Sequence, residues 1–193
     1  HVTISYNGKP VVQDVSFELR QGEILGIVGE SGSGKSTIIK AIMGLLGEEG
    51  LVTRGDIWYR GENLTDMNTK KLRKYLGTEI GMVFQDCKGA LCPVRKIGAQ
   101  IYEAVSEHEK ISRWAVRERA GEIMRKIGLD DSDRVLDSYP FELSGGMNQR
   151  VGICTAMIMR PKLLLADEPT SALDVTVQKQ VVEELLLMRR EYD

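Results

Sequence analysis

The chain has 193 residues, enough for one good-sized domain or two small lobes. Its 42% hydrophobic and 28% charged content is typical of a globular protein, and its net charge of −2 excludes a global electrostatic surface for nucleic acid. The longest apolar tract, residues 151–166, is interrupted by two basic residues and a proline, so it does not predict a membrane-spanning helix.

The cysteines are Cys87, Cys92 and Cys154, too few for a disulfide framework in a chain of this length. Cys87 and Cys92 have neither a second pair nor a nearby histidine to complete a zinc site. We therefore expect three reduced thiols in a cytosolic compartment.

The N-terminal part predicts short strands and one helix. Residues 2–17 alternate around an Asn-Gly-Lys-Pro turn, which indicates two short strands. The apolar run at residues 24–28 predicts a buried strand, and the spacing of apolar residues over 37–46 predicts a helix. Further strands are expected at 56–59 and 79–85.

Between that strand and helix lies Gly29–Ser36, which reads Gly-Glu-Ser-Gly-Ser-Gly-Lys-Ser and is a complete phosphate-binding loop. Its glycines allow a tight backbone turn whose N–H groups point at phosphate oxygens. The Lys35 ammonium can reach the β- and γ-phosphates, and the Ser36 hydroxyl can bind Mg²⁺. The helix start faces the phosphates, so the flanks fit as well as the loop does.

The remainder of the chain is mostly helical. Residues 97–128 show a charged helical pattern, with Ser112 as an expected N-cap and Trp114 on the surface. Residues 139–150 predict a loop that enters a helix, 162–167 a strand, and 175–190 a helix capped by Asp174. The pattern indicates an α/β nucleotide-binding core interrupted by a helical insertion, roughly residues 86–159.

Two acidic residues follow the apolar strand near the end of the chain. A buried strand brings Asp167 to the rim of a sheet, where its carboxylate can hold Mg²⁺ directly or through water. Glu168 follows, and a carboxylate there can polarise a water aimed at the γ-phosphate.

The segment Leu143–Arg150 contains a second helix start with phosphate-binding character. Gly145 and Gly146 expose backbone N–H groups, and Ser144 adds a hydroxyl. One triphosphate does not need two such ends on one chain. A head-to-tail pair of chains explains both, with this end covering the γ-phosphate in the partner's phosphate loop.

These motifs, in this order, resemble the ATP-binding cassette (ABC) transporter ATPase subunits over essentially the whole chain. The motifs are Gly29–Ser36, Gln85, Leu143–Arg150, Leu163–Glu168 and Ser171-Ala172-Leu173-Asp174. The resemblance implies an α/β phosphate-loop NTPase core of the RecA-like type with an N-terminal antiparallel β subdomain. The core would comprise residues 1–85 and 160–193, and the inserted helical subdomain residues 86–159.

The resemblance also implies a role for individual residues. Glu168 would be the catalytic base, helped by Lys35 and Gln85, and Asp174 would communicate between the two sites. Magnesium would be held by Ser36, Gln85 and Asp167. The nucleotide would be bound by Tyr6, stacked on adenine, and by Gly29, Ser31, Gly32, Ser33, Gly34, Lys35, Ser36, Thr37, Ser144, Gly145 and Gly146.

A finer resemblance is to the dipeptide, oligopeptide and nickel importer ATPases of bacteria and archaea. It is carried by Glu30, by the Met147 ending of Leu-Ser-Gly-Gly-Met and by Ala166–Gln178. It implies ATP and Mg²⁺ as cofactors and a peripheral position on the cytoplasmic face of the plasma membrane. The implied partners are a second ATPase, the same or related, two permeases and, indirectly, an external solute-binding protein, but no nucleic acid.

The chain also departs from that pattern. Cys87 and Cys92 stand where the subfamily more often has proline and asparagine, and Asn148 replaces a more usual arginine. The sequence stops at Asp193, before the strand that carries the family's switch histidine, so we expect the C-terminal part of the fold to be missing. An alternative to a working importer ATPase is therefore a nucleotide-binding module that binds MgATP but turns it over poorly.

Overall fold

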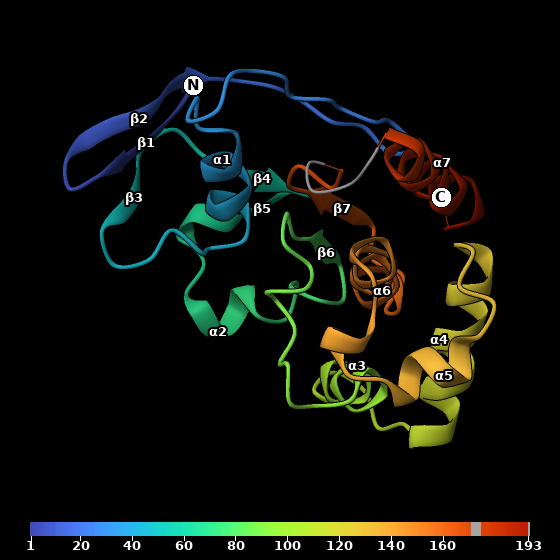
Figure 1. Cartoon of the computed structure of the whole chain (residues 1–193). Coiled ribbons are helices and arrows are strands. Elements are labelled where there is room, and N and C mark those ends of the chain that lie inside the picture. The colour runs from blue at the N-terminus through green and yellow to red at the C-terminus, as the bar shows by residue number, and fades with distance from the viewer. Residues whose placement is uncertain (171–174, 193) are drawn as a thin grey trace. The chain divides into compact units, whose positions relative to one another are not determined.

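The computed structural model describes residues 1–170 and 175–192 (Figure 1). The chain forms two compact units, His1–Leu76 and Gly77–Asp193, which we call the first and the second unit. Both contain strands and helices, which confirms the predicted α/β class. The finer partition into a nucleotide-binding core and a helical subdomain stays a prediction.

The first unit begins with the antiparallel sheet that the sequence predicts. Its strands are β1 (Val2–Tyr6), β2 (Lys9–Val15) and β3 (Gly50–Arg54), in the order β2-β1-β3. Asn7 and Gly8 join the first two strands with φ angles of 49° and 75°, the left-handed conformation that a two-residue type I′ hairpin turn requires.

Helix α1 (Lys35–Ile42) follows the phosphate loop, as predicted, but ends four residues earlier than the apolar spacing suggested. Gly44 adopts a φ of 66°, its N–H donates to the Ala41 carbonyl, and the Leu45 N–H donates to the Lys40 carbonyl. This is a Schellman ending, which stops the helix at a left-handed glycine. Leu45, one of the apolar residues at the predicted helical spacing, is therefore outside the helix and half exposed.

The predicted buried strand at residues 24–28 is wrong. This segment has no regular secondary structure, and its apolar side chains are exposed, Val28 by 96%. A buried strand needs a neighbouring strand to bond its backbone, and the ladders of the described residues do not include this segment. An apolar run indicates surface that favours burial, but it does not identify the pairing partner.

The rest of the first unit consists of short elements. Strands β4 (Trp58–Tyr59) and β5 (Glu62–Asn63) form a hairpin around Arg60 and Gly61, both with positive φ. The predicted strand at 56–59 is thus present but only two residues long. A 3₁₀ turn, η1 (Leu64–Asp66), and α2 (Thr69–Leu72) follow.

The second unit contains two parallel strands, β6 (Ile80–Val83) and β7 (Leu163–Ala166), both predicted. Ile80 lies opposite Leu163, and Val83 lies opposite Ala166. Gly81 lets the end of helix α6 (Gly145–Met157) approach the pair, because a Cβ there would lie 2.6 Å from the Ala156 carbonyl oxygen. The strands are therefore fixed against the helix that begins with the Ser-Gly-Gly element.

Most helices of the second unit pack around one apolar core. They are α3 (Ile97–Ser106), α4 (Arg113–Lys126), α5 (Ser132–Asp137), α6 and α7 (Val175–Tyr192). The predicted N-cap is confirmed, because Ser112 Oγ accepts from the Ala115 N–H at 3.2 Å. The predicted cap Asp174 and the side chains of Val177 and Met188 lie outside the described residues.

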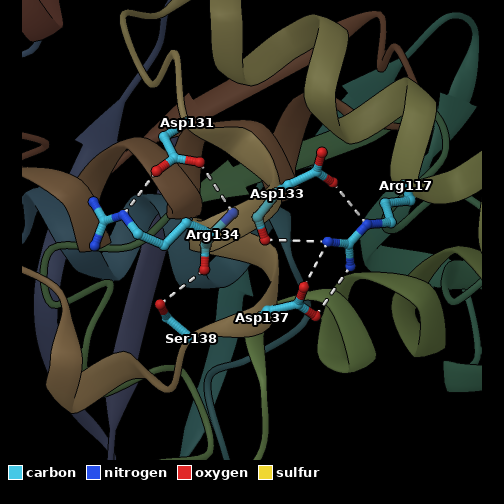
Figure 2. Close-up of polar contacts among 6 residues, drawn as sticks. All are labelled: Arg117, Asp131, Asp133, Arg134, Asp137 and Ser138. Atoms are coloured by element: carbon cyan, nitrogen blue, oxygen red, sulfur yellow. Dashed lines mark hydrogen bonds and ion pairs between the residues drawn. The ribbon is translucent and has the colours of Figure 1, made fainter.

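Helix α5 (Ser132–Asp137) was not predicted, and Figure 2 shows how it is held. Asp131 caps it by accepting from the Arg134 N–H. Arg117 of α4 bonds the Asp133 side chain at 2.9 Å and the Asp137 carboxylate at 2.8 Å. The hydrogen bond from Arg117 lowers the pKa of Asp137. The pair therefore stabilises the fold fully at pH values above the ordinary pKa of an aspartate. This stabilisation is lost as the pH falls through the lowered pKa of Asp137.

The three cysteines differ in accessibility, and this difference gives a test of the second unit. Burial raises the pKa of Cys87 to about 11 and that of Cys154 to about 12, while Cys92 is exposed. We expect a thiol reagent at neutral pH to modify one thiol quickly in the native chain and all three in denaturant. Cys92→Ser should abolish the fast phase; equal rates at two or three thiols would contradict the packing.

Candidate nucleotide-binding site

The phosphate loop is a compact turn whose backbone requires glycine. The Ser33 N–H donates to the Glu30 carbonyl at 3.2 Å, and Gly32 and Gly34 adopt φ angles of 81° and 93°. A Cβ at Gly34 would lie 2.7 Å from Cγ2 of Val12, so β2 packs directly against the loop. Left-handed backbone and close contact both favour glycine at Gly34.

Lys35 lies at the start of α1 with its ammonium turned back over the loop. Its Nζ donates to the carbonyl oxygens of Gly29 at 2.9 Å and Glu30 at 2.8 Å. These bonds hold the positive charge within the loop, beside the helix N-terminus whose dipole also favours an anion.

The other predicted residues of this half surround the helix start. Ser36 and Thr37 are half-buried in the first turn of α1, and Ser31 and Ser33 are exposed on the loop. Gly34 is the N-cap and provides no side-chain oxygen to the helix amides. A helix start of this kind is well suited to donate to phosphate oxygens.

Tyr6 ends β1 in the first unit and is half-buried, opposite Gly50 of β3. A Cβ at Gly50 would lie 2.8 Å from Cε1 of Tyr6, so the ring lies close above the neighbouring strand. Its predicted stacking on adenine stays a prediction.

The second unit brings three predicted residues to the ends of its parallel strands. Asp167 directly follows β7, is 8% exposed, and donates its N–H to the Val83 carbonyl of β6 at 3.1 Å. Gln85 follows β6, and its Nε2 donates to Oε2 of Glu168 at 2.9 Å. Strand register thus places the amide side chain beside the carboxylate predicted as the base.

Glu168 also has an unusual backbone. Its φ is 42°, which only a small fraction of non-glycine residues adopt and which costs about 1 kcal/mol or more. Such conformations are concentrated at functional sites, where the surrounding structure holds them. The Gln85 bond and the strand pairing that fixes Asp167 are two restraints of this kind.

The Ser-Gly-Gly element forms the start of α6, as predicted. Ser144 is the N-cap, and its Oγ accepts from the Met147 N–H at 3.3 Å. Ser144 and Gly145 are exposed and Gly146 is half-buried. This 13-residue helix therefore presents an accessible N-terminus without bulky side chains.

Two supports of α6 were missed by the sequence interpretation. Asn148 is 1% exposed and bonds loop carbonyls, and Arg150 Nε bonds Glu184 Oε1 of α7 at 2.8 Å. Burial raises the pKa of Glu184, and the bond to Arg150 opposes that rise. The polar residues at 148–150 of this helix could have indicated these hydrogen bonds, since a buried polar side chain must have a partner.

A glycine-rich loop that begins a helix, and an Asp-Glu pair that ends a parallel strand, together define a phosphate-loop nucleotide-binding protein. Comparison with known families agrees with this class and narrows it. Residues 12–171 match the family described as ABC transporter, and the chain belongs to that family.

Several relatives are ATP-binding proteins of import systems. The chain is 44% identical to the dipeptide transport ATP-binding protein DppD of Haemophilus influenzae, over 93% of this chain and 54% of that protein. It is 44% identical to the oligopeptide transport ATP-binding protein OppD of Bacillus subtilis, over 98% of this chain and 53% of that protein. It is 40% identical to the metal-staphylopine import system ATP-binding protein CntD of Staphylococcus aureus, over 100% of this chain and 72% of that protein.

The chain thus spans about half the length of the peptide-transport relatives. Among solved structures, it is similar to the ATP-binding cassette MJ0796 in a dimeric post-hydrolysis state bound to ADP and Pi. That match has a TM-score of 0.84 and 28% identity, and covers 98% of this chain and 81% of the other. The fold is therefore that of an ABC ATPase cassette.

Among the described residues, no helix is both long and apolar enough to cross a membrane.

The contact between Gly34 and Val12 can be tested by comparing two alanine substitutions. In Gly32→Ala the added Cβ meets nothing within 4 Å, so the positive φ alone destabilises the fold, by about 1 kcal/mol. Gly34→Ala adds a clash with Val12, so we expect about 1–2 kcal/mol more destabilisation. Denaturant unfolding measures both, and equal losses would show that β2 does not pack on the loop.

Proposed function

We propose that the chain is the ATP-binding and ATP-hydrolysing part of an ABC importer subunit. The hydrogen bond between Gln85 and Glu168 carries this proposal, because it holds a predicted magnesium ligand beside a candidate base. The phosphate loop supplies the binding half, and the relatives support the class of transporter.

ATP would bind with its phosphates over the loop. Lys35 would exchange its bonds to the Gly29 and Glu30 carbonyls for bonds to the β- and γ-phosphates, which a flexible ammonium can do readily. The α1 amides would donate to the same oxygens. Tyr6 would stack on the adenine ring, since an aromatic face binds a base with little need for precise geometry.

Mg²⁺ would be held by oxygen donors of the kind it prefers, a hydroxyl, an amide and a carboxylate from Ser36, Gln85 and Asp167. When bound, it would neutralise charge on the phosphates. Asp167 is held for this role by its backbone bond to β6.

Glu168 would accept a proton from the attacking water. Its carboxylate already accepts from Gln85 Nε2, so its orientation is fixed before the nucleotide arrives. Hydrolysis then transfers the γ-phosphoryl group to water and releases ADP and phosphate.

Two chains would close head to tail around the nucleotides. Ser144, Gly145 and Gly146 would cover the γ-phosphate that the partner's loop binds, adding the hydroxyl and backbone N–H donors of the α6 start. The dimeric post-hydrolysis form of MJ0796 supports this arrangement. The pair would be either a homodimer or a heterodimer with a related ATPase.

The subunit would couple this closure to transport of peptides or nickel. The names of DppD, OppD and CntD support a solute importer, and the cargo would be selected by its permeases and external binding protein. The ATPase would bind the permeases at the cytoplasmic face of a bacterial or archaeal plasma membrane. It would make no contact with nucleic acid.

Glu168→Gln tests the proposed base. Glutamine still accepts a hydrogen bond from Gln85 but cannot take a proton, so we expect about 10²-fold or more slower phosphate release with unchanged MgATP affinity. ATP should also trap a dimer, detectable by light scattering.

Lys35→Ala provides the matching control, because it should abolish tight MgATP binding itself. Unchanged turnover in Glu168→Gln would show that Glu168 is not the catalytic base. Binding without release by the unmodified chain would instead favour a nucleotide-binding module.

Ser144→Arg tests the proposed role of the α6 start across the dimer. We expect unchanged ATP affinity in the monomer and loss of the ATP-dependent dimer, because a long charged side chain would occupy the space of the partner's phosphate. Ser106→Arg, also at an exposed serine, is the control and should leave the dimer intact. A weaker ATP affinity of the Ser144→Arg monomer would contradict a role in the partner's site.

A further inference from the structure

Asn148 makes an unusual set of contacts just behind the exposed start of α6. Its side-chain nitrogen, Nδ2, lies 3.0 Å from the Pro140 carbonyl oxygen and 3.1 Å from those of Leu143 and Ser144. The residue is 1% exposed, so water does not share these bonds. One buried amide therefore serves three carbonyls of the loop that leads into the helix.

The chemistry fixes which way this amide faces. An amide nitrogen carries two protons, so the three carbonyls share them. If the amide were turned over, its oxygen Oδ1 would face three carbonyl oxygens and repel all of them. Oδ1 itself has no hydrogen-bond partner among the described residues, so the contacts to the loop are what the side chain gains from this position.

The contacted loop determines where the Ser144 hydroxyl lies. It consists of a short 3₁₀ turn, η2 (Pro140–Glu142), followed by Leu143 and the cap Ser144. The Asn148 backbone N–H also donates to the Ser144 carbonyl, at 2.9 Å. Asn148 therefore holds Ser144 through both its main chain and its side chain. Its side chain also holds Pro140 and Leu143, which lead into the cap.

We propose that Asn148 is a positioning residue for the phosphate-binding end of α6. It keeps the Pro140–Ser144 loop in one conformation, so that Ser144 and the glycine amides meet the terminal phosphate of a nucleotide on the partner subunit without rearrangement. Donors that are already oriented cost less conformational entropy on binding. This inference rests on the proposed function, because it assumes that the α6 start closes on a partner's nucleotide.

Two substitutions separate the loop contacts from the helix. Serine at this position can still donate to the carbonyl four residues earlier, that of Ser144, but is too short to serve Pro140 and Leu143. Asn148→Ser should therefore keep α6 and release the loop. Asn148→Leu removes the donor with little change in size. Ile153→Val is the matched control, because Ile153 is fully buried in the same helix but is absent from these hydrogen bonds.

The experiment uses the full chain with Glu168→Gln as the parent. Hydrogen exchange measures the order of residues 140–147 in the monomer, and ATP titrations measure nucleotide affinity and dimer formation separately. We expect both Asn148 variants to exchange faster in residues 140–147 and to dimerise about tenfold more weakly, with monomer ATP affinity unchanged. Ile153→Val should lower thermal stability but change neither exchange in that segment nor dimerisation.

Unchanged exchange in both Asn148 variants would overturn the inference, as would an equal loss of dimer in Ile153→Val. If Asn148→Leu does not fold, Asn148→Ser decides alone. Failure of the parent to dimerise with ATP would count against the proposed function instead. In that case the exchange rates would still decide whether Asn148 orders the loop.

Discussion

The parallel pairing of β6 with β7 determines where the candidate catalytic side chains lie. Val83 is opposite Ala166, so the residues that follow each strand emerge at the same end of the pair. Gln85 and Glu168 are 83 positions apart in the sequence and are joined by a 2.9 Å hydrogen bond only because of this register. A slip of one residue in β7 would turn the side chains of Asp167 and Glu168 to the other face of the pair. The hydrogen bond between Gln85 and Glu168 would then break.

That pairing is itself held by the end and the middle of α6. Gly81 of β6 lies so close to the end of the helix that a Cβ would reach the Ala156 carbonyl. Near the middle, a Cβ at Gly152 would lie 2.2 Å from Sγ of Cys87, two residues after Gln85. The helix that begins with the Ser-Gly-Gly element thus packs against both the strand before Gln85 and the segment after it. This close approach is possible because Gly81 and Gly152 have no side chain.

Local chemistry could be predicted from the sequence, and long-range pairing could not. The Asn-Gly turn, the Ser112 cap and the phosphate loop depend on neighbouring residues, so short patterns identified them. The apolar run at 24–28 failed because a strand requires a partner that the run does not specify. Helix α5 was missed because much of its support comes from Arg117, on another helix. The motifs identified which residues to join at the candidate site, and the strand register joined Gln85 to Glu168.

The same distinction explains why Asn148 was seen only as a departure from a family pattern. A phosphate-binding helix start must be exposed and free of bulky side chains, so Ser144 and Gly145 contribute little packing of their own. The order of that end has to come from the residues behind it. Asn148 bonds the loop on one side, and Arg150 bonds Glu184 and Gln180 of α7 on the other. The Asn148 contacts and the bond between Arg150 and Glu184 are buried or partly buried, so they lose little to water and can hold an end that water surrounds.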